Sequence, residues 1–490
     1  MARSLRPVAT LAALVGGASL GAWAVGAEEP PPPTPPVVVK VAAKPAALKR
    51  AVEPKPLGEA AKKGLAFLAK GQNADGGWGQ GGGWRTGAKG RVEGENTADP
   101  SDVGNTSLVL LALFRAGHTA TEGDHQEAVR KGLRFVYERV EKSDGKDLYV
   151  TDVRDTQVQS KIGPFADTFL ATLMLSELKG HAGTDDARLA KCLDKALDKV
   201  AKNQKEDGTF VGNAGWAPVL SQGLATKSLT RARQNGAAVG DELIARATRQ
   251  SRQAAKGTDV AGEPVAGAAG KPEFAKSMSP ATASGIGGGG AGPGDAGVPL
   301  YGRGQASTNL QDVVNVVNAD AAKAKAVIAD PKAPQAKKDE AQKTVAAADK
   351  LNEDNNLLQN RVLKDARDGR FVAGFGSNGG EEFLSFLNLS ETMLVRGGKD
   401  WDDWDAKMQE SLPKAQDKDG SWSGHHCITG KTFCTASALL VLLADRTQFP
   451  EDVLAAARAE AKKEAAKPAV KEVPKPAEAK APDAAPPAEK

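Results

Sequence analysis

Residues 63–78 read KGLAFLAKGQNADGGW, and this stretch decides how the chain is expected to fold. Leu65, Phe67 and Leu68 supply apolar contacts near the end of a helix. Gly71 ends that helix, because glycine accepts a positive φ without a steric penalty. A glutamine, a short polar turn, glycines and a tryptophan follow. The stretch therefore predicts a helix that runs into a tight turn with an aromatic residue after it.

The same pattern recurs twice further along the chain. Residues 195–210 read KALDKVAKNQKEDGTF, and residues 412–422 read LPKAQDKDGSW. In each copy a helical segment ends in a glutamine, which a short acidic turn, a glycine and an aromatic residue follow. The motif residues are Gln72, Gly76 and Trp78, then Gln204, Gly208 and Phe210, then Gln416, Gly420 and Trp422. Three copies indicate an internal repeat.

With these motifs the sequence resembles the prenyltransferase and squalene-cyclase repeat superfamily, whose mark is a helix ending in Gln followed by Gly-x-Trp, the QW motif. The resemblance covers roughly residues 57–245 and 358–447. It implies an all-α fold, an α/α toroid in which a double layer of helices forms a barrel like that of the terpenoid cyclases. The motif is structural in that family, so it informs architecture before chemistry.

Helical segments of two kinds alternate along these ranges. Segments such as 127–140 place apolar residues on one face only, whereas others are apolar on nearly every side, as interior helices are. A double-layered barrel requires this alternation, with the apolar set inside. The interior segments are expected at 107–114, 164–175, 216–232, 381–389 and 432–445. No alternating strand pattern appears in the sequence.

The N-terminus is typical of an export signal. Arg3 and Arg6 precede a short apolar run at 8–20, and small residues suited to cleavage follow. An uncleaved anchor is the alternative. We expect export to the periplasm, the cell envelope or the outside, and a chain that does not span the membrane after cleavage, because no later stretch reaches spanning length.

Composition changes along the chain predict its organisation. We expect an inserted Gly- and Ala-rich segment without apolar periodicity, then an Ala- and Lys-rich helical pair broken at Asp330 and Pro331. The expected parts are a signal peptide (1–27), a Pro-rich linker (28–56), the first part of the toroid (57–245), a disordered insert (246–304), a helical hairpin (305–362), the second part of the toroid (363–447), and a charged helix with a disordered tail (448–490).

The charge balance and the aromatic content argue against two classes of function, nucleic-acid binding and carbocation cyclisation. The chain has 65 Lys and Arg against 61 Asp and Glu, a near balance that argues against nucleic-acid binding. Aromatic residues make up 5% of the chain, which is lean for a channel that guides a carbocation. The cyclases of the family use an Asp-x-Asp-Asp acid. Residues 400–403 match that string, but they begin an outer helix, where capping explains acidic residues.

Other acidic residues are better placed for catalysis. Asp167 lies at the start of an apolar helix, although capping explains it as well. Glu381 and Glu382 open another interior helix. The resemblance implies that a catalytic acid would be a carboxyl group kept protonated in an apolar site. These three residues are therefore the candidate catalytic residues.

A cluster near the C-terminus is the candidate metal site. His425, His426 and Cys427 are adjacent, and Cys434 follows within ten residues. The family's protein prenyltransferases bind zinc through Asp, Cys and His, but this sequence has no Asp-x-Cys pair in the corresponding kind of place. The His and Cys cluster itself makes zinc a candidate cofactor, with Glu381 or Glu382 as an added ligand. The alternatives are a Cys427–Cys434 disulfide, which export would permit, or buried polar packing.

Two functions follow from these observations. The first is an exported toroid that acts as a binding or scaffolding module in the cell envelope. The second is an isoprenoid- or lipid-handling enzyme with its site near His425 to Cys427. The expected partner is an envelope protein or a hydrophobic small molecule.

Overall fold

The structure is a computed structural model of the 490-residue chain, and it describes residues 48–82, 84–85, 92–93, 98–213, 218–257, 300–373 and 379–465. These residues are mostly helical with short strands only, which confirms the all-α class. The expected signal peptide, most of the Pro-rich linker, most of the Gly- and Ala-rich insert and the end of the C-terminal tail lie outside the described residues.

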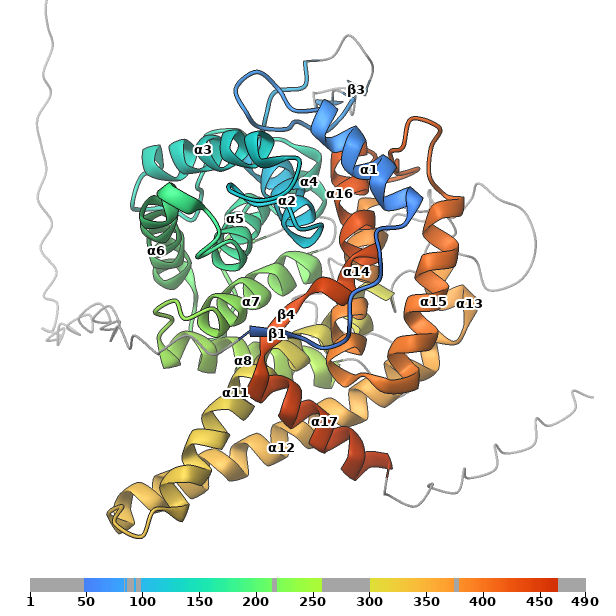
Figure 1. Cartoon of the computed structure of the whole chain (residues 1–490). Helices are drawn as coiled ribbons and strands as arrows, with labels where there is room; N and C mark the ends of the chain where they lie inside the picture. The colour runs from blue at the N-terminus through green and yellow to red at the C-terminus, as the bar shows by residue number, and fades with distance from the viewer. Residues whose placement is uncertain are drawn as a thin grey trace, which may run out of the picture. The chain divides into compact units, whose positions relative to one another are not determined.

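Helices buried along most of their length form the core of the described residues. They are α2 (Val103–Arg115), α5 (Ala166–Glu177), α7 (Pro218–Gln234), the first half of α11 (Gln305–Ala329), α14 (Gly380–Arg396) and α16 (Lys431–Leu442). Each contacts the next along the chain, and α16 returns to contact α2, so that the contacts close into a cycle (Figure 1). The described residues of the apolar segments that the sequence assigns to an interior are mostly buried, in these helices or at their ends.

A second set of helices packs against this core with one face. It comprises α1 (Glu59–Lys70), α3 (Gln126–Lys142), α6 (Asp186–Asn203), α8 (Asp241–Gly257), α12 (Gln335–Ala366) and α15 (Gly398–Lys414). α1 packs on α16, α3 on α2, α6 on α5, α8 on α7 and α11, α12 on α11, and α15 on α14 and α16. In α3, Val129, Leu133 and Val136 are buried whereas Glu127 and Arg134 are exposed, as an amphipathic helix requires.

The remaining described elements are short or lie beside this arrangement. They are α4 (Gln157–Lys161), α13 (Gly369–Ala373), the 3-10 turns η1 (Gly183–Asp185) and η4 (Ala444–Arg446), the π-helical turn η3 (Leu300–Gly304), and the strand pair β2 (Trp84–Arg85) and β3 (Val92–Glu93). α17 (Glu451–Ala465) packs against α11 and α14. β1 (Leu48–Arg50) pairs antiparallel with β4 (Gln448–Pro450). Among the described residues, no helix is long and apolar enough to cross a membrane.

The hairpin expected at 305–362 is formed by α11 and α12, but part of it lies in the core. Residues 305–316 are buried throughout, and α11 contacts α7 and α14. Amide side chains fill this face: Gln305 Nε2 donates to Asn309 Oδ1 at 2.7 Å, and Asn388 Nδ2 of α14 donates to Gln305 Oε1 at 2.8 Å. Apolar periodicity misses α11 as an interior helix because paired amides take the place of apolar side chains.

The first motif turn is fastened at both ends by hydrogen bonds. Gln72 Nε2 donates to the Gly76 carbonyl oxygen at 2.8 Å and to the Ala128 carbonyl oxygen of α3 at 2.9 Å. Trp78 Nε1 donates to the Leu68 carbonyl oxygen of α1 at 2.7 Å. The last motif makes the equivalent bonds, from Gln416 to Gly420 and Ala60, and from Trp422 to Leu412. The motif therefore joins one outer helix to another.

The motif glycines are required by conformation and by space. Gly76, Gly208 and Gly420 have φ values of +89°, +84° and +87°, which side chains rarely adopt. A Cβ there would lie 2.7, 2.3 or 2.8 Å from the carbonyl oxygen of Lys131, Arg246 or Lys63 respectively. Each of these oxygens belongs to an outer helix, so the close approach of turn and helix depends on glycine.

The middle motif departs from the other two. The Gln204 side-chain amide is buried and makes no hydrogen bond to a described residue. Arg246 Nη1 of α8 donates instead to the Gln204 carbonyl oxygen at 3.1 Å. Phe210 is buried in place of a tryptophan and has no N–H to donate. The contact to the next outer helix is kept, with an arginine as the donor.

Candidate functional site

Buried carboxyl groups head three of the core helices. Asp102 is the N-cap of α2, Asp167 lies in the first turn of α5, and Glu381 and Glu382 lie in the first turn of α14. Each is at most 1% exposed. Because burying a carboxylate is costly, each must be hydrogen-bonded, protonated or both.

Asp102 and Asp167 form one carboxyl pair. Asp102 Oδ1 accepts from the Asn105 backbone N–H at 2.7 Å, which caps α2. Asp167 Oδ1 accepts from the Gly104 N–H of the same turn at 2.8 Å, and its Oδ2 accepts from Gln159 Nε2 at 2.8 Å. Burial and the charge of Asp167 raise the pKa of Asp102 to about 8, and burial raises the pKa of Asp167. Asp167 therefore has a structural partner that the sequence did not indicate.

Glu381 and Glu382 form a second pair, on α14. Glu382 Oε2 accepts from the Gly379 N–H at 2.7 Å, and Glu381 Oε2 accepts from the Ile428 N–H at 3.2 Å. Glu381 Oε1 is buried and has no hydrogen-bond partner among the described residues. Burial, and then the charge of Glu382, raise the pKa of Glu381 to about 8; burial also raises the pKa of Glu382. Glu381 is thus largely protonated at neutral pH.

Tyr301 and His426 complete the surroundings of Glu382. The Tyr301 hydroxyl donates to Glu382 Oε1, and His426 Nε2 lies 3.4 Å from the same oxygen. Tyr301 belongs to η3, at the edge of the segment 246–304 that the sequence predicts to be disordered. The prediction of disorder is wrong for the described ends of that segment, because residues 246–257 are helical in α8 and residues 300–304 are helical in η3. No sequence signal marks Tyr301, because its role depends on a contact 81 positions along the chain.

Only part of the cluster of His425, His426 and Cys427 lies against the Glu381 and Glu382 pair. His426 reaches Glu382, whereas His425 is exposed. Cys427 is half-buried with φ of 53°, a left-handed conformation. Burial and the charge of Glu381 raise the pKa of the Cys427 thiol to about 12, and burial raises the pKa of the Cys434 thiol well above its ordinary value. Cys427 is therefore a thiol, not a thiolate, at neutral pH.

The two sequence-based alternatives for these cysteines are not formed in the structure. Cys192, Cys427 and Cys434 are not joined by disulfide bonds. Within the described ranges, no three His, Cys, Asp or Glu side chains are arranged to hold a metal ion. The predicted zinc site thus gains no support from the geometry of His425, His426 and Cys427. Buried polar packing against Glu381 and Glu382 is what the structure shows at this place.

A network of buried charges links the core helices α2, α5, α7 and α14. Glu391 of α14 accepts from Lys227 Nζ at 2.6 Å and from Arg231 Nη2 at 3.1 Å, both of α7, and from Arg115 Nη2 of α2 at 2.9 Å. Arg115 also pairs with Glu177 of α5 at 2.8 Å. Although burial alone would raise the pKa of Glu391, the three cations hold it well below its usual range.

Little space is left beside this network. Leucines of α2, α5, α7, α14 and α16 line it together with Arg115, Lys227 and Glu391. The cavity they enclose measures about 20 Å³. A water molecule needs about 10–15 Å³ by this kind of measure, so there is room for about one.

Comparison of the chain with protein-family models, with curated protein sequences and with solved structures found no match. The motif turns and the helix packing therefore carry the functional argument.

Proposed function

We propose that this chain is an exported α/α toroid that acts as a binding or scaffolding module in the cell envelope. The cyclic contacts of the core helices and the outer layer packed on them support the toroid. The motif turns support kinship with the QW-type repeat superfamily. Export is proposed from the composition of residues 1–27.

One observation carries the binding role: the cavity between the core helices beside Glu391 has room for about one water molecule. Sites for small molecules usually measure about 300–1,000 Å³, whereas the cavity beside Glu391 measures about 20 Å³. A polyprenoid substrate would have to displace a buried network of charges at this place. The outer surface is thus better suited to recognition than the interior of the core.

The test is to offer the purified full chain squalene and geranylgeranyl diphosphate and to measure saturable binding and product. The binding module predicts neither. Export is tested separately, by sequencing the N-terminus of chain recovered from the envelope fraction. Cleavage after Ala24 or Ala27 is expected, and chain retained uncleaved in the cytosol would contradict export.

A specific observation favours lipid-handling catalysis as a second candidate. Glu381 heads a core helix, is protonated at neutral pH, and has one oxygen without a partner among the described residues. A buried protonated carboxyl group is what acid catalysis on an apolar substrate requires. If turnover of either lipid were observed, lost in Glu381→Gln and kept in the exposed control Glu410→Gln, the enzyme would replace the binding module.

A further inference from the structure

Lys227 of α7 lies between two buried carboxyl groups that come from different helices. Its Nζ is 2.6 Å from Glu391 Oε2 of α14 and 3.3 Å from Asp312 Oδ2 of α11. The three side chains are at most 6% exposed. Asp312 Oδ2 is buried and has no partner with hydrogen-bond geometry among the described residues. An amine and a carboxyl group, the two groups that form an amide bond, are therefore held at short range.

The two carboxyl groups differ in protonation because their surroundings differ. Burial raises the pKa of Asp312, which favours the protonated acid. Burial alone would raise the pKa of Glu391 as well, but Lys227, Arg231 and Arg115 hold it well below its usual range. Two carboxyl groups whose pKa values are pushed apart can take opposite roles in one reaction. Here Asp312 has a hydroxyl that can leave as water, and Glu391 is a carboxylate that can accept a proton.

We propose that Lys227 and Asp312 condense to an intramolecular amide bond that links α7 to α11. Lys227 gives a proton to Glu391 Oε2, and the lone pair of the free Nζ then attacks Cγ of Asp312. The Nζ–Cγ bond forms, the bond from Cγ to the hydroxyl oxygen breaks, and the hydroxyl leaves with a proton from nitrogen as one water molecule. Glu391 finally passes its proton to solvent. One water and one proton are released, and no oxidant, reductant or co-reactant takes part.

The surroundings of Asp312 favour this condensation. Groups held in contact react as if they were highly concentrated, which replaces the activation that amide formation needs in free solution. The positive charge of Arg231 acts on Asp312, and it would stabilise the oxyanion that forms when Nζ adds to Cγ. The cavity of about 20 Å³ lined by Lys227 and Glu391 has room for the water that is released.

The bond would also remove a charge that the core otherwise has to bury. When Asp312 is protonated, the buried network has one more cation than carboxylates. Its charged members are Arg115, Lys227, Arg231, Glu177 and Glu391. A buried charge without a partner is costly. An amide at Lys227 leaves two cations facing two carboxylates, so the amide balances the network. None of the functions proposed above uses this bond.

Mass spectrometry of the purified full chain tests the proposal. After incubation of the folded chain at neutral pH, the intact mass should be one water molecule below the mass calculated from its sequence. After denaturation and digestion with trypsin, residues 206–231 and 304–323 should appear as one branched peptide that is uncut after Lys227. Lys227→Arg keeps the positive charge beside Glu391, but its guanidinium does not condense, so residues 304–323 should appear as a free peptide. Lys323→Arg, at an exposed lysine of α11, is the matched control and should keep the branched peptide.

Two results would overturn the proposal. The first is a folded wild-type chain that has its calculated mass and is cut by trypsin after Lys227, and this result needs no variant. The second is a branched peptide that persists in Lys227→Arg, because another amine would then carry the bond. Glu391→Gln is expected to lose the bond too, but its stability is also expected to fall, so Lys227→Arg is the deciding variant. None of these results depends on what the outer surface binds, so this proposal and the proposed function fail separately.

Discussion

Gln416 and Ala60 lie 356 positions apart in the chain, and the Gln416 side chain Nε2 donates to the Ala60 carbonyl oxygen at 2.9 Å. The Gln72 side chain makes the same bond to the carbonyl oxygen of Ala128, near the start of α3. The last motif therefore contacts the first outer helix as the first motif contacts α3. β1 also pairs with β4, which joins residues from near the two ends of the described chain (Figure 1). The Trp422 ring lies close to Gly64 of α1.

Gln416→Ala should weaken the contact between the last motif and α1. It removes two hydrogen bonds from a half-buried amide, to Ala60 and Gly420, and should lower the free energy of unfolding by about 1–3 kcal/mol. Urea denaturation measures the loss. Gln335→Ala is the control, because the Gln335 amide bonds only to Asp339 on the exposed surface of α12. Equal stability of the two variants would show that the motif glutamine does not hold the ends together.

Gly64→Ala should destabilise the protein, although alanine normally favours a helix over glycine. A Cβ at Gly64 would lie 2.8 Å from Trp422 Cζ3 and 3.1 Å from Leu439 Cδ2, both buried. Overpacking of this kind costs about 1–3 kcal/mol. Thermal melting of Gly64→Ala beside Gly58→Ala, where a Cβ has open space, measures the difference. A Gly64→Ala variant that melts at or above the wild-type temperature would contradict this packing.

Glu391→Gln should be among the most damaging polar substitutions. It leaves Lys227, Arg231 and Arg115 buried without their shared counter-charge. Removing one partner of a buried ion pair costs about 3–5 kcal/mol. Chemical denaturation checks this, with Glu410→Gln, which breaks an exposed pair with Lys414, expected to change nothing measurable. A tolerated Glu391→Gln would mean that water reaches the network.

Stability should fall as pH rises from about 4.5 to about 8. In this window the unfolded chain loses the proton of Glu381, whose ordinary pKa is 4.5, while the folded chain keeps it because the pKa there is about 8. The folded state then binds more protons, so the free energy of unfolding decreases with pH. Asp102 acts in the same direction. Glu391 acts oppositely and only below about 4.5, where its protonation removes stability.

Urea denaturation at pH 5, 6, 7 and 8 tests this dependence. Glu381→Gln, which cannot titrate, should show a shallower decline than the wild type and should gain relative stability at pH 8. An identical decline in both proteins would mean that Glu381 does not hold a proton in the folded state.

Cys427 should react slowly with iodoacetamide in the folded protein. Because the pKa of its thiol is about 12, little thiolate exists at pH 8, and alkylation should be at least a hundredfold slower than that of an ordinary cysteine. Mass spectrometry of the labelled chain measures the rate. Glu381, whose pKa is about 8, is partly ionised at pH 8, so Glu381→Gln removes a partial negative charge beside the thiol and should speed the reaction. Rapid labelling of wild-type Cys427, or a Cys427–Cys434 bridge in the intact mass, would contradict a protonated thiol outside a disulfide.

The sequence predicts the helices well because their signals are local. Leu108 to Leu113 are apolar on every side and are buried in α2, whereas α3 shows one apolar face and buries that face only. The motif turns are equally readable, because glycine and tryptophan stand at fixed distances from a helix end. α11 was also predicted as a helix, in the hairpin 305–362, and only its place in the core was missed. Its buried face carries amides such as Gln305 and Asn309, so apolar periodicity does not mark it as an interior helix.

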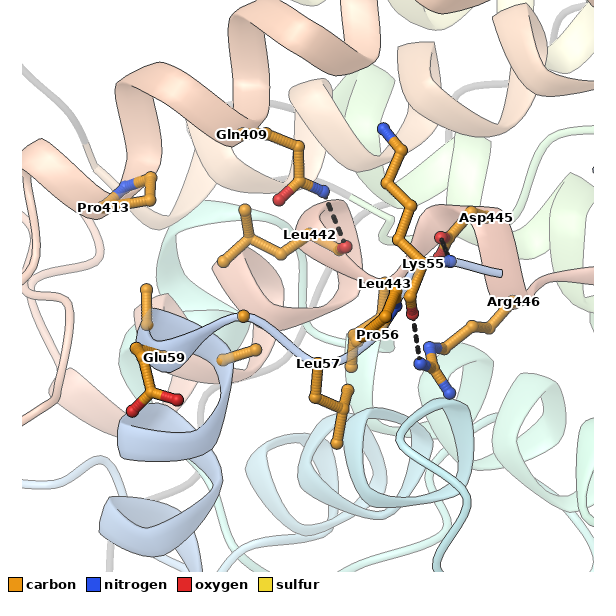
Figure 2. Close-up of a pocket in the computed structure, with 13 residues that line it drawn as sticks. Lys55, Pro56, Leu57, Glu59, Gln409, Pro413, Leu442, Leu443, Asp445 and Arg446 are labelled. Carbon is orange, nitrogen blue, oxygen red and sulfur yellow. Dashed lines mark hydrogen bonds between the residues drawn. The ribbon is translucent and has the colours of Figure 1, made fainter. Parts of the chain in front are cut away.

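The candidate site was only partly predictable. Asp167, Glu381 and Glu382 are found at the heads of core helices, as their positions in the sequence indicate. Their partners were not foreseen: Asp102 stands 65 positions before Asp167, and Tyr301 stands 81 positions before Glu382. The pocket of about 320 Å³ in Figure 2 was missed for the same reason, since its walls come from both ends of the described chain.

By itself the sequence determined which segments are helical, which face each helix hides, and where turns require glycine, because periodicity and backbone conformation depend on near neighbours. Only the tertiary structure decided which outer helix Gln416 reaches, which carboxyl groups share a buried place, and how Glu391 is neutralised. Those outcomes depend on packing between residues far apart in the chain. A buried polar group needs a hydrogen-bond or charge partner, and here that partner lies on another helix.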